Sequence, residues 1–143
     1  MERNTYLVNV AGVKRELPLF DVKPGLRIAV LNILGDTELV EESAKALINK
    51  LGDAEYELIV TAESKSIPLA HAMAAIKGIR YVVLRKSYKP YMGEALQVQT
   101  NSITTGTQQL LILDEKDQKL VKSKKVLIVD DVISTGSTLE GMR

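Results

Sequence analysis

Two adjacent carboxylates, Asp130 and Asp131, stand directly after the apolar run 126–129 and before a cluster of small hydroxylated residues. Such a run is typical of a buried strand, and open α/β sheets bind ligands beyond the carboxyl ends of their strands. Two carboxylates without a ligand would be expensive to desolvate. The pair is therefore predicted to hold paired sugar hydroxyls or a hard cation.

The hydroxylated cluster predicts an anion site. It consists of Ser134, Thr135, Gly136, Ser137 and Thr138. Glycine lets the backbone approach closely, the hydroxyls can donate, and a following helix start adds free amides and roughly half a positive charge. A phosphate monoester fits this pattern, whereas a Walker loop or a dinucleotide turn would need other residues. The alternative is a loop that ends in an ordinary helix cap.

Alternating strands and helices must position these residues. Short apolar segments at 57–61, 81–84 and 125–130 predict strands, the last being the strongest candidate for a buried one. Helical spacing of apolar residues indicates helices at 38–51 and about 68–77. This alternation predicts an α/β domain built on a mainly parallel sheet flanked by helices.

The remaining segments are predicted to form accessory structure. Residues 6–10 and 13–19 indicate a small amino-terminal β-flap, and residues 27–34 read as a further buried strand. Residues 94–102 and 108–113 resemble an antiparallel pair, followed by a polar stretch at 114–118.

The whole chain, 1–143, is expected to be one domain. It divides into a hood at about 1–26 and a core at about 27–143, and within the core the loop at about 87–105 is expected to be mobile. The start of this loop, 85–93, breaks the apolar pattern and reads as exposed.

Composition excludes several classes of protein. A net charge of +1 argues against a nucleic-acid partner, and the absence of cysteine excludes disulfides and thiolate metal sites. No apolar run is long enough for a membrane helix, and the amino terminus lacks the features of a secretory signal. A cytoplasmic protein is the resulting expectation.

Three segments resemble one known family. Residues 126–138, VLIVDDVISTGST, are similar to the phosphoribosyl pyrophosphate signature of type I phosphoribosyltransferases. Residues 58–70, LIVTAESKSIPLA, resemble the pyrophosphate-loop region of the adenine branch, and residues 83–89, VLRKSYK, resemble its Arg-Lys strand end. The resemblance spans most of residues 17–143.

The resemblance implies a role for each matching residue. Asp130 and Asp131 would hold the ribose hydroxyls, and the hydroxylated cluster would enclose the 5-phosphate. Arg85 and Lys86 would add positive charge near the pyrophosphate, and Lys89 would belong to the mobile loop. The segment facing the pyrophosphate would be Ala62, Glu63, Ser64 and Lys65. In the alternative interpretation Lys65, Arg85 and Lys89 are surface cations, and Glu63 caps the following helix.

The resemblance further implies a purine phosphoribosyltransferase, with Asp130, Asp131 and Arg85 as its catalytic residues. Mg²⁺ would be held through substrate oxygens and water, with no metal site made by the protein. Adenine is the first choice of base, with xanthine, hypoxanthine or another purine as alternatives. A homodimer is expected.

Two departures from the family pattern stand out. Residues 103–107, ITTGT, lack the glutamate that the adenine branch often carries there, so another proton relay would be needed. The chain also stops at Arg143, soon after the signature, which suggests a truncated fold. A noncatalytic regulator that senses phosphoribosyl pyrophosphate, or an inactive remnant, is the rival interpretation.

Overall fold

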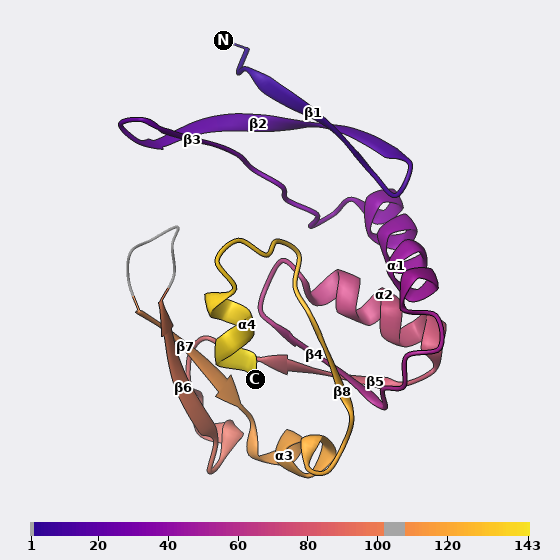
Figure 1. Cartoon of the computed structure of the whole chain (residues 1–143). Coiled ribbons are helices and arrows are strands. Elements are labelled where there is room, and N and C mark those ends of the chain that lie inside the picture. Colours follow the sequence, from indigo (N-terminus) through magenta and orange to yellow (C-terminus); the bar gives the residue numbers. More distant parts are fainter. Residues whose placement is uncertain (1, 102–107) are drawn as a thin grey trace.

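A three-stranded antiparallel sheet forms a layer apart from the main body of the protein (Figure 1). The computed structural model describes residues 2–101 and 108–143. Within it, β1 (Thr5–Val10) pairs with β2 (Val13–Lys23), and β2 pairs with β3 (Leu26–Ala29). Ala11 and Gly12 turn the first hairpin with φ of 52° and 84°, which confirms the predicted flap.

The prediction of a buried strand at 27–34 is wrong. Only β3 is extended there; it is paired with β2 in the flap, and Ile33 is the one buried residue of that range. Residues 28–31 line the site cavity and Ile33 joins the core cluster formed by α1, α2 and β4, so the segment packs on the main body without entering the parallel sheet. An apolar run of this length does not by itself reveal which surface it covers.

The main body is built on a parallel sheet of order β5-β4-β8, as predicted. β4 (Leu58–Ala62) lies between β5 (Arg80–Leu84) and β8 (Val126–Val129), and all of its residues are buried. The prediction that 125–130 is the most buried strand is wrong, because only Val129 of β8 is fully buried. β8 pairs with β4 alone among the described strands, whereas β4 is paired on both sides.

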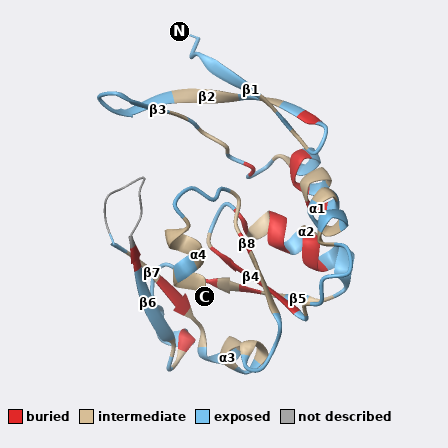
Figure 2. Ribbon diagram, viewed as in Figure 1, coloured by how far each residue is buried: buried red, intermediate tan, exposed pale blue. Residues whose placement is uncertain are grey.

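Both faces of β4 are covered, as Figure 2 shows. On one face Ile59 joins a core cluster with α1 (Thr37–Leu51) and α2 (Ile67–Lys77), which confirms both predicted helices. On the other face the alternate residues Leu58, Val60 and Ala62 pack with Leu111. This alternation follows from the two-residue period of a strand.

The second face is completed by elements from the last third of the chain. β6 (Leu96–Asn101) and β7 (Gln108–Leu113) form the predicted antiparallel pair, and Arg85 bridges to Ile112. The polar stretch at 114–118 is largely a helix, α3 (Glu115–Val121), capped by Asp114. The sequence prediction missed this helix because its turns carry mostly charged residues.

The predicted loop 85–93 is exposed over residues 86–91, as expected, but one of its residues anchors it to the core. A 3₁₀ turn, η1 (Pro90–Met92), buries Met92 completely, and the Tyr88 hydroxyl donates to the Gly93 carbonyl at 2.8 Å. The described part of this loop is therefore anchored.

Charge pairs attach the flap to the main body. Arg15 of β2 donates to both carboxylate oxygens of Asp36, at 2.7 and 3.0 Å, and to Glu38. Asp36 also caps α1 by accepting from the Leu39 N–H. The Arg15 guanidinium and this cap hold the pKa of Asp36 below its usual range.

The last helix, α4 (Ser137–Met142), rests on β6. A side chain at Gly141 would overlap the methyl group of Thr100 and crowd Leu111. No helix among the described residues has the length and apolar character needed to cross a membrane.

Replacing Met92 with alanine tests the anchoring of the 85–93 loop. Met92→Ala should lower the free energy of unfolding by about 2–5 kcal/mol, because it empties a fully buried site. The neighbouring Tyr91, 74% exposed, is the matched control, and Tyr91→Ala should change it by less than ~0.5 kcal/mol. Urea denaturation measures both, and equal effects would show that the turn does not pack as described.

Candidate active site

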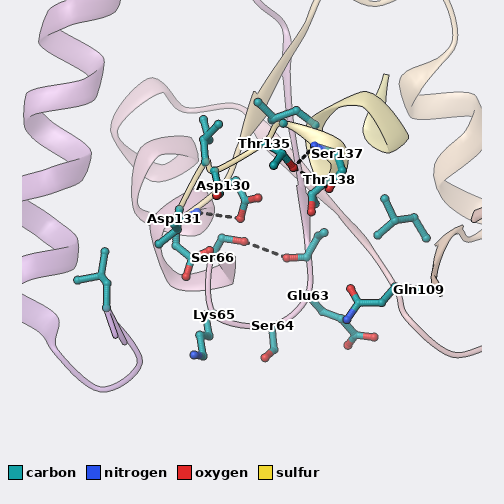
Figure 3. A pocket seen from close by; sticks show the side chains of 18 of the residues that line it. Glu63, Ser64, Lys65, Ser66, Gln109, Asp130, Asp131, Thr135, Ser137 and Thr138 are labelled. Atoms are coloured by element: carbon teal, nitrogen blue, oxygen red, sulfur yellow. Dashed lines mark hydrogen bonds between the residues drawn. The ribbon is translucent and has the colours of Figure 1, made fainter. Parts of the chain in front are cut away.

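A cavity of about 400 Å³ lies at the carboxyl edge of the parallel sheet. Three connections meet there: the β4–α2 loop, the end of β5, and the turn between β8 and α4. Figure 3 shows Asp130 and Asp131 between the hydroxylated turn and Ser64 and Lys65 of the β4–α2 loop. The volume falls in the usual range of small-ligand pockets, roughly 300–1,000 Å³.

The cavity brings together all of the predicted site residues except Arg85 and Lys89. The predicted residues that line it are Ala62, Glu63, Ser64, Lys65, Lys86, Asp130, Asp131, Ser134, Thr135, Gly136, Ser137 and Thr138. They come from segments up to 76 positions apart in sequence, between Ala62 and Thr138, and the parallel pairing of β4 with β5 and β8 places them at one edge.

Asp130 and Asp131 begin the turn after β8. The Asp131 N–H donates to Asp130 Oδ1 at 2.9 Å, so the two residues form a compact acidic unit. Burial, followed by the hydrogen bond to the Asp131 side chain, raises the pKa of Asp130 to about 6, against the smaller opposing effect of Lys86. A half-buried carboxyl that resists ionisation is typical of a ligand site.

The hydroxylated turn is a loop with a left-handed glycine at its centre. Gly136 has φ of 84°, a backbone region that favours glycine, and it is the residue before α4. The Ser137 N–H donates to Thr135 Oγ1 at 3.4 Å, a long hydrogen bond. Since α4 has only six residues, its dipole is short, so an anion at this turn would be held mainly by backbone amides and hydroxyls.

Glu63 does not cap the helix that follows it. Its carboxylate accepts from the Arg85 side chain at 3.1 Å and from the Lys86 N–H, which ties the end of β4 to the end of β5. Arg85 is thus directed to Glu63, outside the residues that line the cavity, and Lys89 is exposed next to η1. The Glu63–Ser64 peptide bond is cis.

Sequence reasoning missed several residues of the cavity wall. Val132 and Ile133 are apolar residues within the signature itself and are 52% and 63% exposed; their position between the acidic pair and the hydroxylated turn was the sequence signal that could have revealed them. Residues 28–31, which begin in β3 of the flap, line the cavity as well. Gln109 of β7 also lines the cavity, and no sequence feature singled it out.

The fold and the site together define an α/β protein that gathers an acidic pair and a hydroxylated turn in one cavity at the carboxyl edge of its sheet. The model of the phosphoribosyl transferase domain family matches residues 30–142. The chain belongs to this family, in its type I fold class.

Known relatives agree with this assignment. The adenine phosphoribosyltransferase of Thermotoga sp. (strain RQ2) is 33% identical over 129 residues, covering 90% of this chain and 72% of the relative. The hypoxanthine/guanine phosphoribosyltransferase of Methanosarcina acetivorans is 36% identical over 104 residues, covering 73% and 51%. The purine biosynthesis transcriptional repressor PurR of Bacillus subtilis is 27% identical over 121 residues, covering 85% and 42%.

A solved structure shares the fold. The adenine phosphoribosyltransferase of Thermoanaerobacter pseudethanolicus superposes with a TM-score of 0.69 at 22% identity, covering 88% of this chain and 72% of that one. This chain spans about half or less of the length of the repressor and of the hypoxanthine/guanine enzyme.

The pKa of Asp130 predicts how stability depends on pH. A carboxyl with a raised pKa binds its proton more tightly in the folded chain, so between about pH 4 and about pH 6 folding takes up protons and stability falls as pH rises. Asp130→Asn should remove this decrease in the free energy of unfolding, which is on the order of 1 kcal/mol after allowance for solvent screening. Urea unfolding at pH 4.5 and 7.5 measures the difference between the two proteins. The free energy of unfolding of Asp130→Asn minus that of the wild type should be greater at pH 7.5 than at pH 4.5. A difference that does not change with pH would contradict the raised pKa of Asp130.

Proposed function

We propose that the protein is a magnesium-dependent purine phosphoribosyltransferase that transfers the 5-phosphoribosyl group of phosphoribosyl pyrophosphate to a nucleobase, adenine being the first candidate. The observation that carries the proposal is the shared cavity of the acidic pair, the hydroxylated turn and the β4–α2 loop. Membership of the phosphoribosyl transferase family supports it.

The acidic pair and the hydroxylated turn would hold the ribose 5-phosphate half of the donor. Asp130 and Asp131 accept from the two ribose hydroxyls, and the raised pKa of Asp130 falls back when hydroxyl donors and cations approach its carboxylate. Backbone amides and hydroxyls at 134–138 surround the 5-phosphate, with room for it above Gly136, where the chain carries no side chain.

The pyrophosphate half would lie against Ala62, Glu63, Ser64 and Lys65. Lys65 and Lys86 line the cavity and supply positive charge there. Arg85 adds charge beside this segment and, paired with Glu63, keeps the loop in place. Lys89 and the rest of residues 87–105 are proposed to close over the substrates. The described part of that segment is anchored at Met92, so closure would involve motion around this turn.

Magnesium fits the charges of the cavity. Its walls carry three carboxylates, Glu63, Asp130 and Asp131, against two lysines, so a polyanionic substrate needs an added cation. A Mg²⁺ ion would be held largely by substrate oxygens and water beside Asp130 and Asp131. When bound, the ion neutralises charge on the leaving pyrophosphate.

The reaction joins a base nitrogen to ribose C1 as the bond from C1 to the pyrophosphate oxygen breaks. Pyrophosphate leaves with the bonding electrons, and the base nitrogen gives up its proton. C1 gains positive character at the transition state, which the neighbouring carboxylates of Asp130 and Asp131 favour electrostatically. The protein thus acts by positioning and charge, without a nucleophile of its own.

The base would bind against the apolar part of the cavity, which is lined by Ile28, Val30, Leu31, Val132 and Ile133. Apolar side chains suit the flat ring of a nucleobase. Adenine rests on the resemblance of residues 58–70 and 83–89 and on the 33% identical adenine enzyme, and hypoxanthine, guanine and xanthine are the competing bases. Residues 103–107, where the usual acid is missing from the sequence, lie outside the described residues.

A second candidate is a sensor of phosphoribosyl pyrophosphate without catalytic activity. The relationship to the PurR repressor favours it specifically. Such a protein would bind the donor in the same cavity and leave every base unchanged. We also propose a cytoplasmic homodimer as the working form of the protein.

A base panel tests both candidates. The protein is incubated with Mg²⁺, phosphoribosyl pyrophosphate and adenine, hypoxanthine, guanine or xanthine, and nucleotide and pyrophosphate are quantified by chromatography. Nucleotide from one of these bases is the expected result. Binding of the donor without product from any base would reject the enzyme and favour the sensor.

Neutralising the acidic pair tests the ribose contact. Asp130→Asn combined with Asp131→Asn should lower kcat/KM at least ~100-fold, because both charged acceptors for the ribose hydroxyls are lost. Circular dichroism should show an intact fold. Asp53→Asn, an exposed carboxylate after α1, is the control and should retain activity. Undiminished turnover of the double variant would refute the contact.

A further inference from the structure

Two buried hydroxyls lie beneath the β4–α2 loop, and sequence reasoning assigned them no role. Thr61, in β4, is 0% exposed, and Ser66, the residue before α2, is 2% exposed. They stand on either side of residues 62–65, the segment proposed to face pyrophosphate. Ser66 also lines the cavity (Figure 3).

Three short contacts connect this pair to its surroundings. Thr61 Oγ1 and Ser66 Oγ are 2.7 Å apart, so they hold the two ends of the loop together. Thr61 Oγ1 is 2.7 Å from the Val129 carbonyl oxygen, and Ser66 Oγ is 2.9 Å from the Ala62 carbonyl oxygen. Val129 directly precedes Asp130, so the pair links the loop to the strand that carries the acidic residues.

The proton count shows that the contacts depend on one another. Each hydroxyl has one proton to donate, so two protons serve three contacts. If the Thr61–Ser66 hydrogen bond is made, either Ser66 donates to Thr61, which donates to Val129, or Thr61 donates to Ser66, which donates to Ala62. If both hydroxyls donate to the carbonyl oxygens instead, that bond is lost. The 2.7 Å between the two hydroxyl oxygens is a hydrogen-bond distance and favours the arrangements that keep the bond.

Ser66 is not an ordinary helix cap. Its side chain makes no capping hydrogen bond to α2, although serine often does so at this position. Its hydroxyl is directed back toward β4 and the loop. The bond therefore stabilises the shape of residues 62–65 rather than the start of the helix.

We propose that Thr61 and Ser66 are positioning residues that fix the pyrophosphate-facing loop relative to Asp130. The inference rests on the proposed function for the identity of the ligand. Loss of either hydroxyl releases the loop, while the hydroxylated turn at 134–138 stays as it is. Pyrophosphate affinity should therefore fall without a matching loss of ribose 5-phosphate affinity.

Calorimetry with two separate ligands tests the proposal. Inorganic pyrophosphate with Mg²⁺ and ribose 5-phosphate are each titrated into the wild type, Thr61→Val, Ser66→Ala and the double variant. Each single variant should bind pyrophosphate about 10-fold more weakly, the loss expected for one hydrogen bond, and bind ribose 5-phosphate within about 2-fold of the wild type. The double variant should be little worse than either single one, because both remove the same bond.

Three controls make the test specific. Thr61→Ser keeps the hydroxyl and should bind pyrophosphate as the wild type does, and Ser123→Ala removes an exposed hydroxyl between α3 and β8, outside the cavity, and should have no effect. Thermal unfolding confirms that each variant is folded. If Thr61→Val does not fold, the comparison of Ser66→Ala with Ser123→Ala decides, since both delete a hydroxyl from the same small side chain.

Three results would overturn the inference. The variants could lose affinity equally for both ligands, the losses of affinity could add up in the double variant, or Ser66→Ala could bind pyrophosphate as tightly as the wild type. Its failure is distinct from that of the proposed function. A wild type that binds both ligands and makes no nucleotide refutes the transferase, while the binding comparison still decides the role of the hydroxyls. A wild type that binds neither ligand refutes both.

Discussion

The site depends on the parallel pairing of β4 with strands on both sides. Ala62 pairs with Leu84, and Thr61 pairs with Val129, so the chain leaves all three strands at the same edge. Parallel strands place their carboxyl ends together, and loops freed from pairing can turn backbone amides toward a ligand. Burial of β4 on both faces fixes this register, since a shift of one residue would turn each of its side chains to the opposite face of the sheet and into the other core cluster.

Some carboxylates of the protein are paired with an arginine, whereas Asp130 and Asp131 form no ion pair within the described residues. Glu63 is paired with Arg85, and Asp36 is paired with Arg15, so these carboxylates serve structure. Asp130 and Asp131 lie side by side, and burial makes ionisation of Asp130 unfavourable. Stability given up at such a position is typical of binding sites, where the ligand supplies the missing partners.

The sequence predicted features that depend on neighbouring residues. The signature at 126–138, the hairpin turn at Ala11–Gly12 and the amphipathic α1 each show their physical cause within a short window. Features set by distant partners were missed or misplaced. Residues 27–34 have the composition of a core strand, yet residues 28–31 line the cavity and the segment does not join the parallel sheet. Arg85 contacts Glu63 across 22 positions. The Thr61–Val129 contact spans 68 positions and has no local signal at all.

The close approach of Gly141 to Thr100 connects two parts of the molecule that have separate roles at the active site. Helix α4 follows the hydroxylated turn directly, and β6 belongs to the ribbon that carries Gln109 on its partner strand. Because Gly141 has no side chain, the helix packs directly against the side chains of Thr100 and Leu111 in the ribbon. During divergence the ribbon can therefore change its outer residues freely, whereas its inner face and the final helix must change together.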